Sequence, residues 1–468
     1  MTEKKQPVKA RVNNRSRTPH SAEFMNFIGS GWAGDRRTDP KRLEVAKYAA
    51  GRRLKVSQAF KGSVIFIEAG SLKTRSNDTD YRFRAHSAFA HLTGWGAATV
   101  PDSVLVIDAR KRNVKEYLYL RPTAGRNTEE FFANPQIGEF WVGARPSLKH
   151  VSALLDIETR DIANLKVDFA EVEKAKRIDL KNPLLAEFVS ELRLVKDDYE
   201  IAEMRKAVAA SVKGFENIVR SLPEAVRHER GERIVEGAFF AEARANGNDL
   251  GYDTIAASGE HACILHWIEN DGKVNKKDLI LVDAGVEVES LYTADVTRTL
   301  PVSGKFSPTQ RKIYEAVLEA ADAAFSVAKP GVKFREVHAA AMKVIAAKTA
   351  EWGLLPVSAE ESLEVEKQFH RRWMVHGTSH HLGLDVHDCA AARREMYLDA
   401  ELKPGMIFTI EPGLYFHADD LLVPKEFRGI GVRIEDDVLV TKNGVENLTR
   451  ALPRKVDEIE KWMAKLAR

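Results

Sequence analysis

The sequence predicts an α+β protein in which a smaller α/β domain precedes a larger domain with an internal pseudo-twofold repeat. One observation is the length of 468 residues, which exceeds what one hydrophobic core normally supports. Another is the composition, because 44% hydrophobic and 30% charged residues can build a core and exclude a wholly disordered or collagen-like chain. The last is the order of predicted elements, in which helices followed by strands occur twice.

Charge and cysteine content narrow the class of protein. Lysine and arginine number 71 against 68 aspartate and glutamate, so the net charge of +3 gives no general case for binding nucleic acid or a membrane surface. The two cysteines, Cys263 and Cys389, exclude a disulfide framework and a thiolate zinc cluster. We find neither an apolar run of about 18 residues nor a secretion signal, and we therefore expect a cytoplasmic protein.

The N-terminal part separates into a tail and a first domain. Residues 1–22 are rich in basic and poor in apolar side chains, which indicates a mobile basic tail rather than a targeting or nucleic-acid-binding segment. Residues 23–192 mix β-rich runs with helical stretches and predict an α/β domain, whose polar residues form no recognisable ligand set. We expect it to shape access to a site elsewhere. Its clearest elements are a helix at 41–53 and strands at 63–67, 103–107 and 116–120.

The second domain, residues 193–468, begins with a long amphipathic helix from Asp197, because apolar residues recur every three or four positions behind acidic starting residues. In the second half of the domain, Ser307 and Pro308 provide a cap and a first-turn proline for another helix, which ends at 329–331. The halves 197–301 and 307–441 share one element order, which favours the pseudo-twofold arrangement. The remaining predicted elements are helices at 229–246 and 334–352 and strands near Thr254, Ile264, 279–288, 292–302, Val375, 406–412 and 430–441.

Carboxylates lie within the apolar strands of this domain. Asp283 is embedded in an apolar run, and a hairpin turning near Glu289 and Ser290 would bring Asp295 opposite it. A buried charge needs an opposite charge or a metal, since desolvation alone costs several kcal/mol. Arg298 could neutralise one of the two acids, so a structural salt bridge is the alternative for this pair.

The second half of the domain supplies two more acids in the same setting, Glu411 and Glu435. Four such carboxylates cannot share one interior as free anions, which favours a pair of divalent cations. His380 is the most plausible nitrogen donor, and this oxygen-rich set suits manganese, with cobalt, iron or zinc as alternatives. Five protein ligands for two metals require at least one bridging carboxylate. His376 lies four residues before His380, but the helical zinc-peptidase motif is absent, and His381 is expected to be a bystander.

Several ordered segments resemble aminopeptidase P, the Xaa-Pro aminopeptidase of the pita-bread metallopeptidases. The similarity spans the whole second domain, and a further segment, Tyr81–Trp95, resembles the N-terminal domain of that family, which is shared with creatinase. The segments in the second domain are Cys263–Asn270, Leu281–Gly285, Ala294–Thr299, His376–Asp388, Thr409–Tyr415 and Gly431–Asp436.

The resemblance implies a role for each matching residue. One metal would be held by Asp295, His380, Glu411 and Glu435 and the other by Asp283, Asp295 and Glu435, so that Asp295 and Glu435 bridge. It further implies that three histidines line the substrate site, that Glu411 also moves protons, and that two residues support the metal ligands. The histidines are His266, His376 and His387, and the supporting residues are Arg433 and Tyr415.

The sequence departs from the family pattern in three places. Eleven residues separate Asp283 from Asp295, one more than is usual, which predicts a bulge that keeps both carboxylates on one face. Cys389 begins a Cys-Ala-Ala stretch where relatives often have Val-Gly-Gly, and residues 416–428 form a polar loop that resembles an insertion. The last two departures affect the expected substrate preference and leave the ligand set intact.

The implied activity is hydrolysis of the bond between an N-terminal residue and a following proline by an enzyme with two divalent metal ions, most suitably Mn²⁺. Expected partners are peptides with proline at position two and further copies of the chain in a dimer or tetramer, without nucleic acid or membrane. Prolidase, acting on Xaa-Pro dipeptides, is the nearest alternative, and related centres also hydrolyse organophosphates. Methionine aminopeptidase would leave the first domain unexplained. Creatinase and metal-free binding proteins of this fold lack ligands that are all present here.

Overall fold

The computed structural model describes residues 20–33 and 40–466, so that most of the expected basic tail, residues 1–19, lies outside the described residues. The chain divides into two compact units, Met1–Leu185 and Ala186–Arg468. Within the described ranges, no helix has both the length and the apolar character that crossing a bilayer requires.

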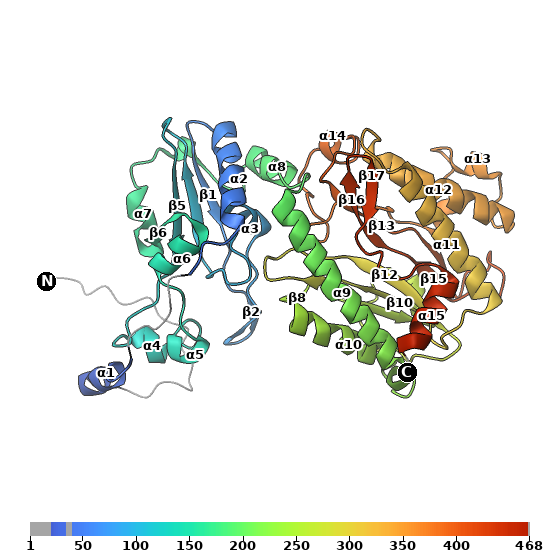
Figure 1. The fold of residues 1–468 in the computed structure, drawn as a ribbon, viewed down its shortest axis with the longest axis horizontal. Coiled ribbons are helices and arrows are strands. Elements are labelled where there is room, and N and C mark those ends of the chain that lie inside the picture. Colours follow the sequence, from blue (N-terminus) through green and yellow to red (C-terminus); the bar gives the residue numbers. More distant parts are fainter. Residues whose placement is uncertain (1–19, 34–39, 467–468) are drawn as a thin grey trace. The chain divides into compact units, whose positions relative to one another are not determined.

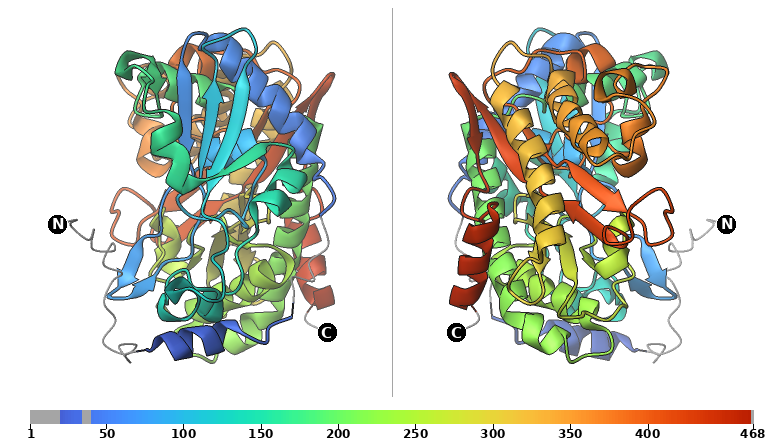
Figure 2. Two further views of the ribbon diagram at one scale, coloured as in Figure 1. Left: turned by 90° about the vertical axis from the view of Figure 1, so that its left-hand side faces the viewer. Right: turned by 90° about the vertical axis from the view of Figure 1, so that its right-hand side faces the viewer.

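The first unit is built on a mixed five-stranded sheet in the order β6-β5-β4-β1-β7. The three central strands pair antiparallel and lie side by side in Figure 2, whereas β6 and β7 join the sheet in parallel. The strands predicted at 63–67, 103–107 and 116–120 and the helix predicted at 41–53 are confirmed. The strands are β1 (Val64–Glu68), β4 (Val104–Asp108), β5 (Lys115–Leu120), β6 (Glu158–Asp161) and β7 (Arg177–Ile178), with a small hairpin of β2 (Thr74–Ser76) and β3 (Thr79–Asp80). The helices are α1 (Ala22–Gly29), α2 (Val45–Ala59), α3 (Ser87–Thr93), α4 (Glu129–Ala133), α5 (Glu139–Val142), α6 (Leu148–Leu155) and α7 (Leu165–Asp168).

Two pairs of long helices belong to the second unit. The first pair is α9 (Asp198–Ala225) and α10 (Gly231–Asn246), and the second is α11 (Pro308–Val327) and α12 (Phe334–Glu351). The two helices of each pair pack against each other (Figure 2). The capping residues that the sequence indicates are in place, since Asp197 forms a capping box at α9 and Ser307 forms one at α11. The other helices are α8 (Pro183–Glu191), which crosses the limit between the units, α13 (Ala359–Ser362), α14 (Arg394–Tyr397) and α15 (Val456–Leu466).

The strands of the second unit follow each helix pair, as the repeat predicts (Figure 1). One three-stranded sheet has the order β12-β10-β9 and another the order β13-β16-β17, while β14 pairs with β15 and β8 with β11. This is the pseudo-twofold α+β arrangement. The strands are β8 (Asp249–Leu250), β9 (Ile255–Ser258), β10 (Leu279–Ala284), β11 (Val286–Glu287), β12 (Val296–Pro301), β13 (Ile407–Ile410), β14 (Gly413–Phe416), β15 (Ile430–Arg433), β16 (Asp436–Thr441) and β17 (Gly444–Asn447).

The hairpin between β10 and β12 differs in detail from the prediction. It turns near Glu289 as expected, but Asp283 lies opposite Thr297, so that Asp295 is a diagonal neighbour of Asp283 rather than its direct partner. The predicted bulge is wrong, because the bridge between Glu287 and Thr293 continues the register of β10 and β12 without a shift. Residues 295 and 297 point to the same face of a strand, so both acids share one face without an extra residue.

Two predicted strands are absent. Ile264 follows a short 3₁₀ helix, Gly259–Cys263, and Val375 lies in an irregular segment after another, Phe369–Trp373. Both side chains are largely exposed. An apolar segment becomes a strand only when a neighbouring strand pairs with it, and no strand in the described part of the chain pairs with either segment.

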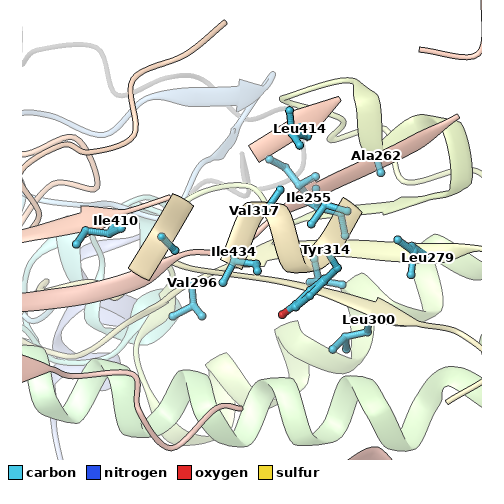
Figure 3. Packing of buried hydrophobic residues seen from close by; sticks show 14 of the residues in the cluster. Ile255, Ala262, Leu279, Val296, Leu300, Tyr314, Val317, Ile410, Leu414 and Ile434 are labelled. Atoms are coloured by element: carbon cyan, nitrogen blue, oxygen red, sulfur yellow. The ribbon is translucent and has the colours of Figure 1, made fainter. Parts of the chain in front are cut away.

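One continuous hydrophobic core holds the second unit together. It joins strands from both halves with the inner faces of α9 to α12, and Figure 3 shows Val296, Tyr314, Val317, Ile410 and Ile434 within it. Side chains from strands far apart in the sequence are therefore packed at fixed positions, which gives the polar residues on these strands a rigid support.

Candidate metal centre

The first half of the second unit contributes two carboxylates. Asp283 lies in β10 and Asp295 immediately before β12. The hydroxyl of Tyr252 lies 2.7 Å from Oδ1 of Asp283 and 2.5 Å from Oδ1 of Asp295, so one phenol links the two acids. Both acids are therefore held on the same side of the sheet.

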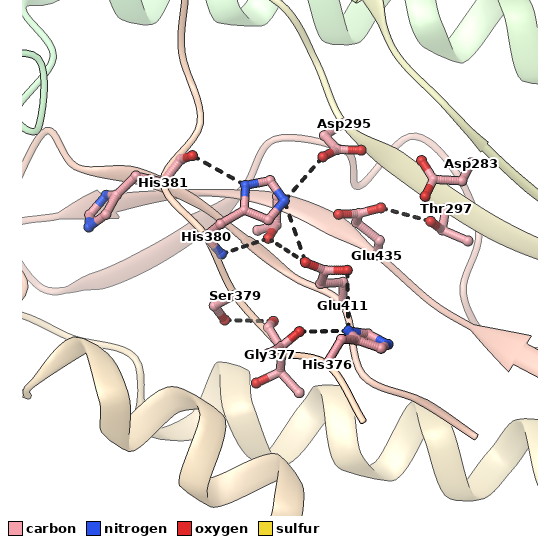
Figure 4. A network of polar contacts seen from close by, with 12 residues as sticks. Asp283, Asp295, Thr297, His376, Gly377, Ser379, His380, His381, Glu411 and Glu435 are labelled. Carbon is pink, nitrogen blue, oxygen red and sulfur yellow. Dashed lines mark hydrogen bonds and ion pairs between the residues drawn. The ribbon is translucent and has the colours of Figure 1, made fainter. Parts of the chain in front are cut away.

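The second half contributes a histidine and two glutamates (Figure 4). Nε2 of His380 lies 3.2 Å from Oδ2 of Asp295 and 3.4 Å from Oε1 of Glu411. Glu435, between β15 and β16, accepts a hydrogen bond of 2.7 Å from the hydroxyl of Thr297. Ligand atoms of Asp295, His380 and Glu435 all lie within 4.8 Å of one another. The two halves thus place their polar groups at one point.

A cavity of about 690 Å³ gives access to these groups. All five residues of the expected ligand set line it, together with Arg433 and the three expected substrate-site histidines. Tyr415 does not line the cavity, but its hydroxyl lies 3.1 Å from Nη1 of Arg433 and 2.7 Å from Nε2 of His376. The apolar part of the wall comes from Ile255, Leu265, Ile268 and Val386.

Burial shifts the pKa values of these acids in a way that indicates excess negative charge. Burial, followed by the neighbouring carboxylates, raises the pKa of Glu435 well above its usual range, and burial raises that of Glu411 to about 7. The pKa of Asp283 is raised by burial despite Arg433, which lies 2.5 Å away. Burial is the largest single effect on Asp295 and opposes its ionisation, but the hydrogen bond and charge of His380, together with the hydrogen bond from Tyr252, lower the pKa of Asp295 overall.

The arrangement fits divalent cations. Four buried or half-buried carboxylates face one cavity, and Arg433 is the guanidinium bound among them, so several negative charges are left without compensation. Carboxylates with one imidazole form a hard donor set, which suits a divalent ion such as Mn²⁺ better than a structural zinc site. Bound cations would offset both the burial and the repulsion between carboxylates that raise the pKa values of Glu411 and Glu435.

The surrounding histidines differ in their environment. Burial, followed by Arg433, lowers the pKa of His376 to about 3, so its ring is neutral near pH 7. Burial also lowers the pKa of His387, whose ring packs edge-on against that of His380 with centroids 4.5 Å apart. His381 is fully buried and stacks on Phe334, outside the cavity lining, in agreement with its expected bystander position.

Three residues near the centre were not identified from the sequence. Thr297 follows Asp295 by two positions, and strand alternation could have placed it on the same face. Tyr252 lies in an irregular segment without any periodic signal, and buried Asp437 accepts from the backbone N–H of Asp295 at 3.3 Å. The alternative prediction, a structural salt bridge between Arg298 and Asp283 or Asp295, is wrong. Arg298 instead pairs with Asp436 at 2.7 Å.

Known families match both units. The profile of metallopeptidase family M24 matches residues 202–442, which include the complete five-residue set. The chain belongs to metallopeptidase family M24. The profile of the aminopeptidase P N-terminal domain matches residues 49–178. The chain therefore has the same two-domain architecture as the aminopeptidases P of this family.

Curated relatives extend the similarity over the full length. Xaa-Pro aminopeptidase 1 of Streptomyces coelicolor is 46% identical over 99% of this chain and 96% of its own, and Xaa-Pro aminopeptidase of Escherichia coli is 32% identical over 88% and 96%. Among solved structures, aminopeptidase P from E. coli with the inhibitor Pro-Leu has a TM-score of 0.78 at 29% identity and covers 91% of this chain and 99% of its own. A zinc-substituted form of the E. coli enzyme in complex with product aligns with the same TM-score.

Proposed function

We propose that the chain is an aminopeptidase that hydrolyses the bond between an N-terminal residue and a following proline. The observation that supports this most directly is the set of four carboxylates and one histidine around a single cavity, in a chain whose full length resembles Xaa-Pro aminopeptidases. The chain is a metal-dependent hydrolase by its family, and we propose two divalent ions, most suitably Mn²⁺, as the resident metals.

The proposed ligand sets use every acid of the centre. Asp295, His380, Glu411 and Glu435 would hold one ion, and Asp283 with the bridging Asp295 and Glu435 would hold the other. When bound, such a pair polarises the substrate carbonyl and lowers the pKa of the attacking water. Arg433 supports this arrangement, because its Nη2 lies 2.5 Å from Oδ2 of Asp283 and its Nε lies 3.1 Å from the hydroxyl of Thr297.

Proton transfer falls to Glu411 and the histidines. The proline nitrogen of the substrate belongs to a tertiary amide and must be protonated as it leaves. Glu411 lines the cavity, so its carboxylate can take a proton from the attacking water and pass it to that nitrogen. His376 assists from the same side, since its Nδ1 lies 3.8 Å from Oε2 of Glu411. Neutral His387 can donate a hydrogen bond to the developing oxyanion, and His266 lines the substrate side.

Hydrolysis of a peptide series tests this function. With Mn²⁺, the protein should cleave Xaa-Pro-Yaa peptides after the first residue, whereas turnover of Xaa-Pro dipeptides alone would identify a prolidase. Glu411→Gln should lower kcat by roughly 10²–10⁴-fold while the chain remains folded. The control Glu446→Gln removes a half-buried acid outside the cavity, which pairs with Arg205, and should retain full turnover. Full turnover by Glu411→Gln would contradict the assignment.

Location and assembly follow as further proposals. Cys263 and Cys389 are both buried and free, in keeping with a reducing cytoplasm. We propose a homo-oligomer, a dimer or tetramer, which light scattering on the purified protein tests directly. A monomer over the whole concentration range of the assay would refute the assembly.

A further inference from the structure

The wall of the cavity that carries His266 has little regular structure. Between β9 and β10 the chain forms the 3₁₀ helix Gly259–Cys263 and then continues without a helix or strand as far as Leu279. Leu265, His266 and Ile268 from this segment line the cavity. Because no strand ladder holds these residues, their positions depend on side-chain anchors.

The principal anchor is Glu232, at the start of α10. Its carboxylate is completely buried, and each of the two oxygens accepts two hydrogen bonds. Oε1 accepts from the backbone N–H of Ser258 at 2.8 Å and pairs with Nδ1 of His261 at 2.8 Å. Oε2 accepts from Nε1 of Trp267 at 2.9 Å and from the backbone N–H of Gly272 at 2.7 Å. One side chain therefore holds the beginning, middle and end of the segment.

This contact is closely fitted. A Cβ added to Gly272 would lie 2.8 Å from Oε2 of Glu232 and 2.7 Å from Cε1 of His261, so the backbone approaches the carboxylate as only glycine allows. The rings of His261 and Trp267 stack with centroids 3.9 Å apart. Among the described residues, no lysine or arginine pairs with Glu232, and compensation of its buried charge comes from these four donors.

A second anchor lies beyond His266. Asn270 is fully buried in a left-handed conformation with φ of 49°. Its Oδ1 accepts from the N–H of Ala256 at 2.9 Å, and its Nδ2 donates to the carbonyl of Thr254 at 2.8 Å, which ties the segment to β9. His266 is thus enclosed between a tie to α10 and a tie to the sheet.

We propose that Glu232 is a positioning residue that fixes His266 for the peptide substrate. The inference rests on the proposed function, in which His266 contacts the peptide. Glu232 itself does not line the cavity, so it acts through the segment and not by touching substrate.

Substitution by glutamine identifies what the carboxylate contributes. Glutamine keeps the shape but offers one acceptor oxygen, whereas backbone N–H groups face both carboxylate oxygens, from Ser258 and from Gly272. His261 can change its tautomer, so that its Nδ1 accepts a hydrogen bond from the new amide group. Nε1 of Trp267 is always a donor and cannot accept one. The NH₂ group of the new glutamine should therefore face Ser258 and His261. The hydrogen bond from the backbone N–H of Ser258 to residue 232 is then lost.

The test is a double-mutant cycle between Glu232→Gln and His266→Ala, with Mn²⁺ and an Xaa-Pro-Yaa peptide. Displacement of His266 by a fraction of an ångström to one ångström should lower kcat/KM by roughly 10–100-fold. In the His266→Ala background the same change should cost less than about twofold, because the residue through which Glu232 acts is absent. An equal loss in both backgrounds would overturn the proposal.

Measurements without turnover separate this inference from the proposed function. Glu232→Gln should leave Mn²⁺ binding unchanged and accelerate amide hydrogen exchange in residues 259–275. Unchanged exchange there overturns the proposal. If the wild-type chain cleaves no Xaa-Pro-Yaa peptide, the proposed function fails, and the exchange result alone decides whether Glu232 holds the segment.

Two further variants complete the design. Glu242→Gln alters an acid ten residues, or about 15 Å, further along α10, where it contacts Asn246, and should change neither exchange nor kcat/KM. Trp267→Phe removes one donor to Glu232 but keeps the aromatic ring, so it provides the test if Glu232→Gln does not fold. It should produce a smaller loss that also disappears in the His266→Ala background, and a loss that persists there overturns the proposal.

Discussion

A buried ion pair supports the segment that bears His387, and its removal should destabilise the second unit. Nζ of Lys196 lies 3.1 Å from Oδ2 of Asp388, and both side chains are at most 1% exposed. Asp388 follows His387 directly, and its backbone N–H donates to the carbonyl of His381 at 2.8 Å. Lys196→Met keeps a side chain of similar length but removes the cation.

The expected loss follows from what remains around the carboxylate. Removal of one partner of a buried ion pair typically costs about 3–5 kcal/mol, because the other charge is left unpaired. In this case Nε of Arg193 still lies 3.4 Å from Oδ1 of Asp388, and the N–H of Cys389 donates to the same oxygen at 3.0 Å. We therefore expect a value at the lower end, about 3 kcal/mol of unfolding free energy.

The loss should also depend on pH. Burial raises the pKa of Asp388, but the charges of Arg193 and Lys196 outweigh burial and keep it below its usual value. Its contribution is thus present above the unfolded pKa of about 3.9 and lost as pH falls through the folded value. Without Lys196 the pKa rises, so the variant can take up a proton in the folded state, and the destabilisation should shrink as pH falls toward 5.

Urea unfolding measures this loss of unfolding free energy when it is applied to the wild type, Lys196→Met, Asp388→Asn and the double variant. The double variant should cost less than the sum of the single variants by about 1 kcal/mol or more, because it leaves no unpaired carboxylate. Lys206→Met, which alters a lysine that is 66% exposed, should change stability by less than about 0.5 kcal/mol. A loss below about 1 kcal/mol for Lys196→Met, or strict additivity, would refute the reasoning.

Further predictions concern the metal site and a helix terminus. Mn²⁺ affinity should fall as pH decreases from 8 to 6, because protons compete for Glu411, whose pKa burial raises to about 7; calorimetry at several pH values that shows constant affinity would contradict this. Ser307→Ala should cost about 1 kcal/mol in urea unfolding, since the hydroxyl accepts the N–H of Gln310 at 3.2 Å in the capping box of α11, and an unchanged midpoint would show that the cap contributes nothing.

The parts of the fold that the sequence predicts are those in which local chemistry and tertiary structure agree. Asp197 and Ser307 begin their helices because each has both the capping oxygen and an apolar repeat behind it. The strand around Asp283 was identified because its neighbours are uniformly apolar. Ile264 and Val375 were misassigned since an apolar side chain carries no information about whether a strand will pair beside it.

The parts of the site that the sequence did not reveal depend on long-range contacts. Glu232 reads as an ordinary acid at a helix N-terminus, where it favours the helix dipole, although its partners lie 26–40 residues away. Tyr252 has no periodic context and acquires its position only when β10 and β12 bring two acids to its hydroxyl. Strand patterns thus indicate the ligands, whereas the residues that orient them become visible only in the folded chain.

Metal stoichiometry tests the proposed dinuclear centre most directly. Titration of Mn²⁺ into metal-free protein, with elemental analysis of the product, should give two ions per chain for the wild type and for Asp420→Asn, which alters an acid outside the cavity. Asp295→Asn and Glu435→Gln, which change the two proposed bridging ligands, should each fail to retain two ions while preserving the fold. Failure of the wild type to bind Mn²⁺, or two ions retained by either bridging variant, would contradict the proposed centre.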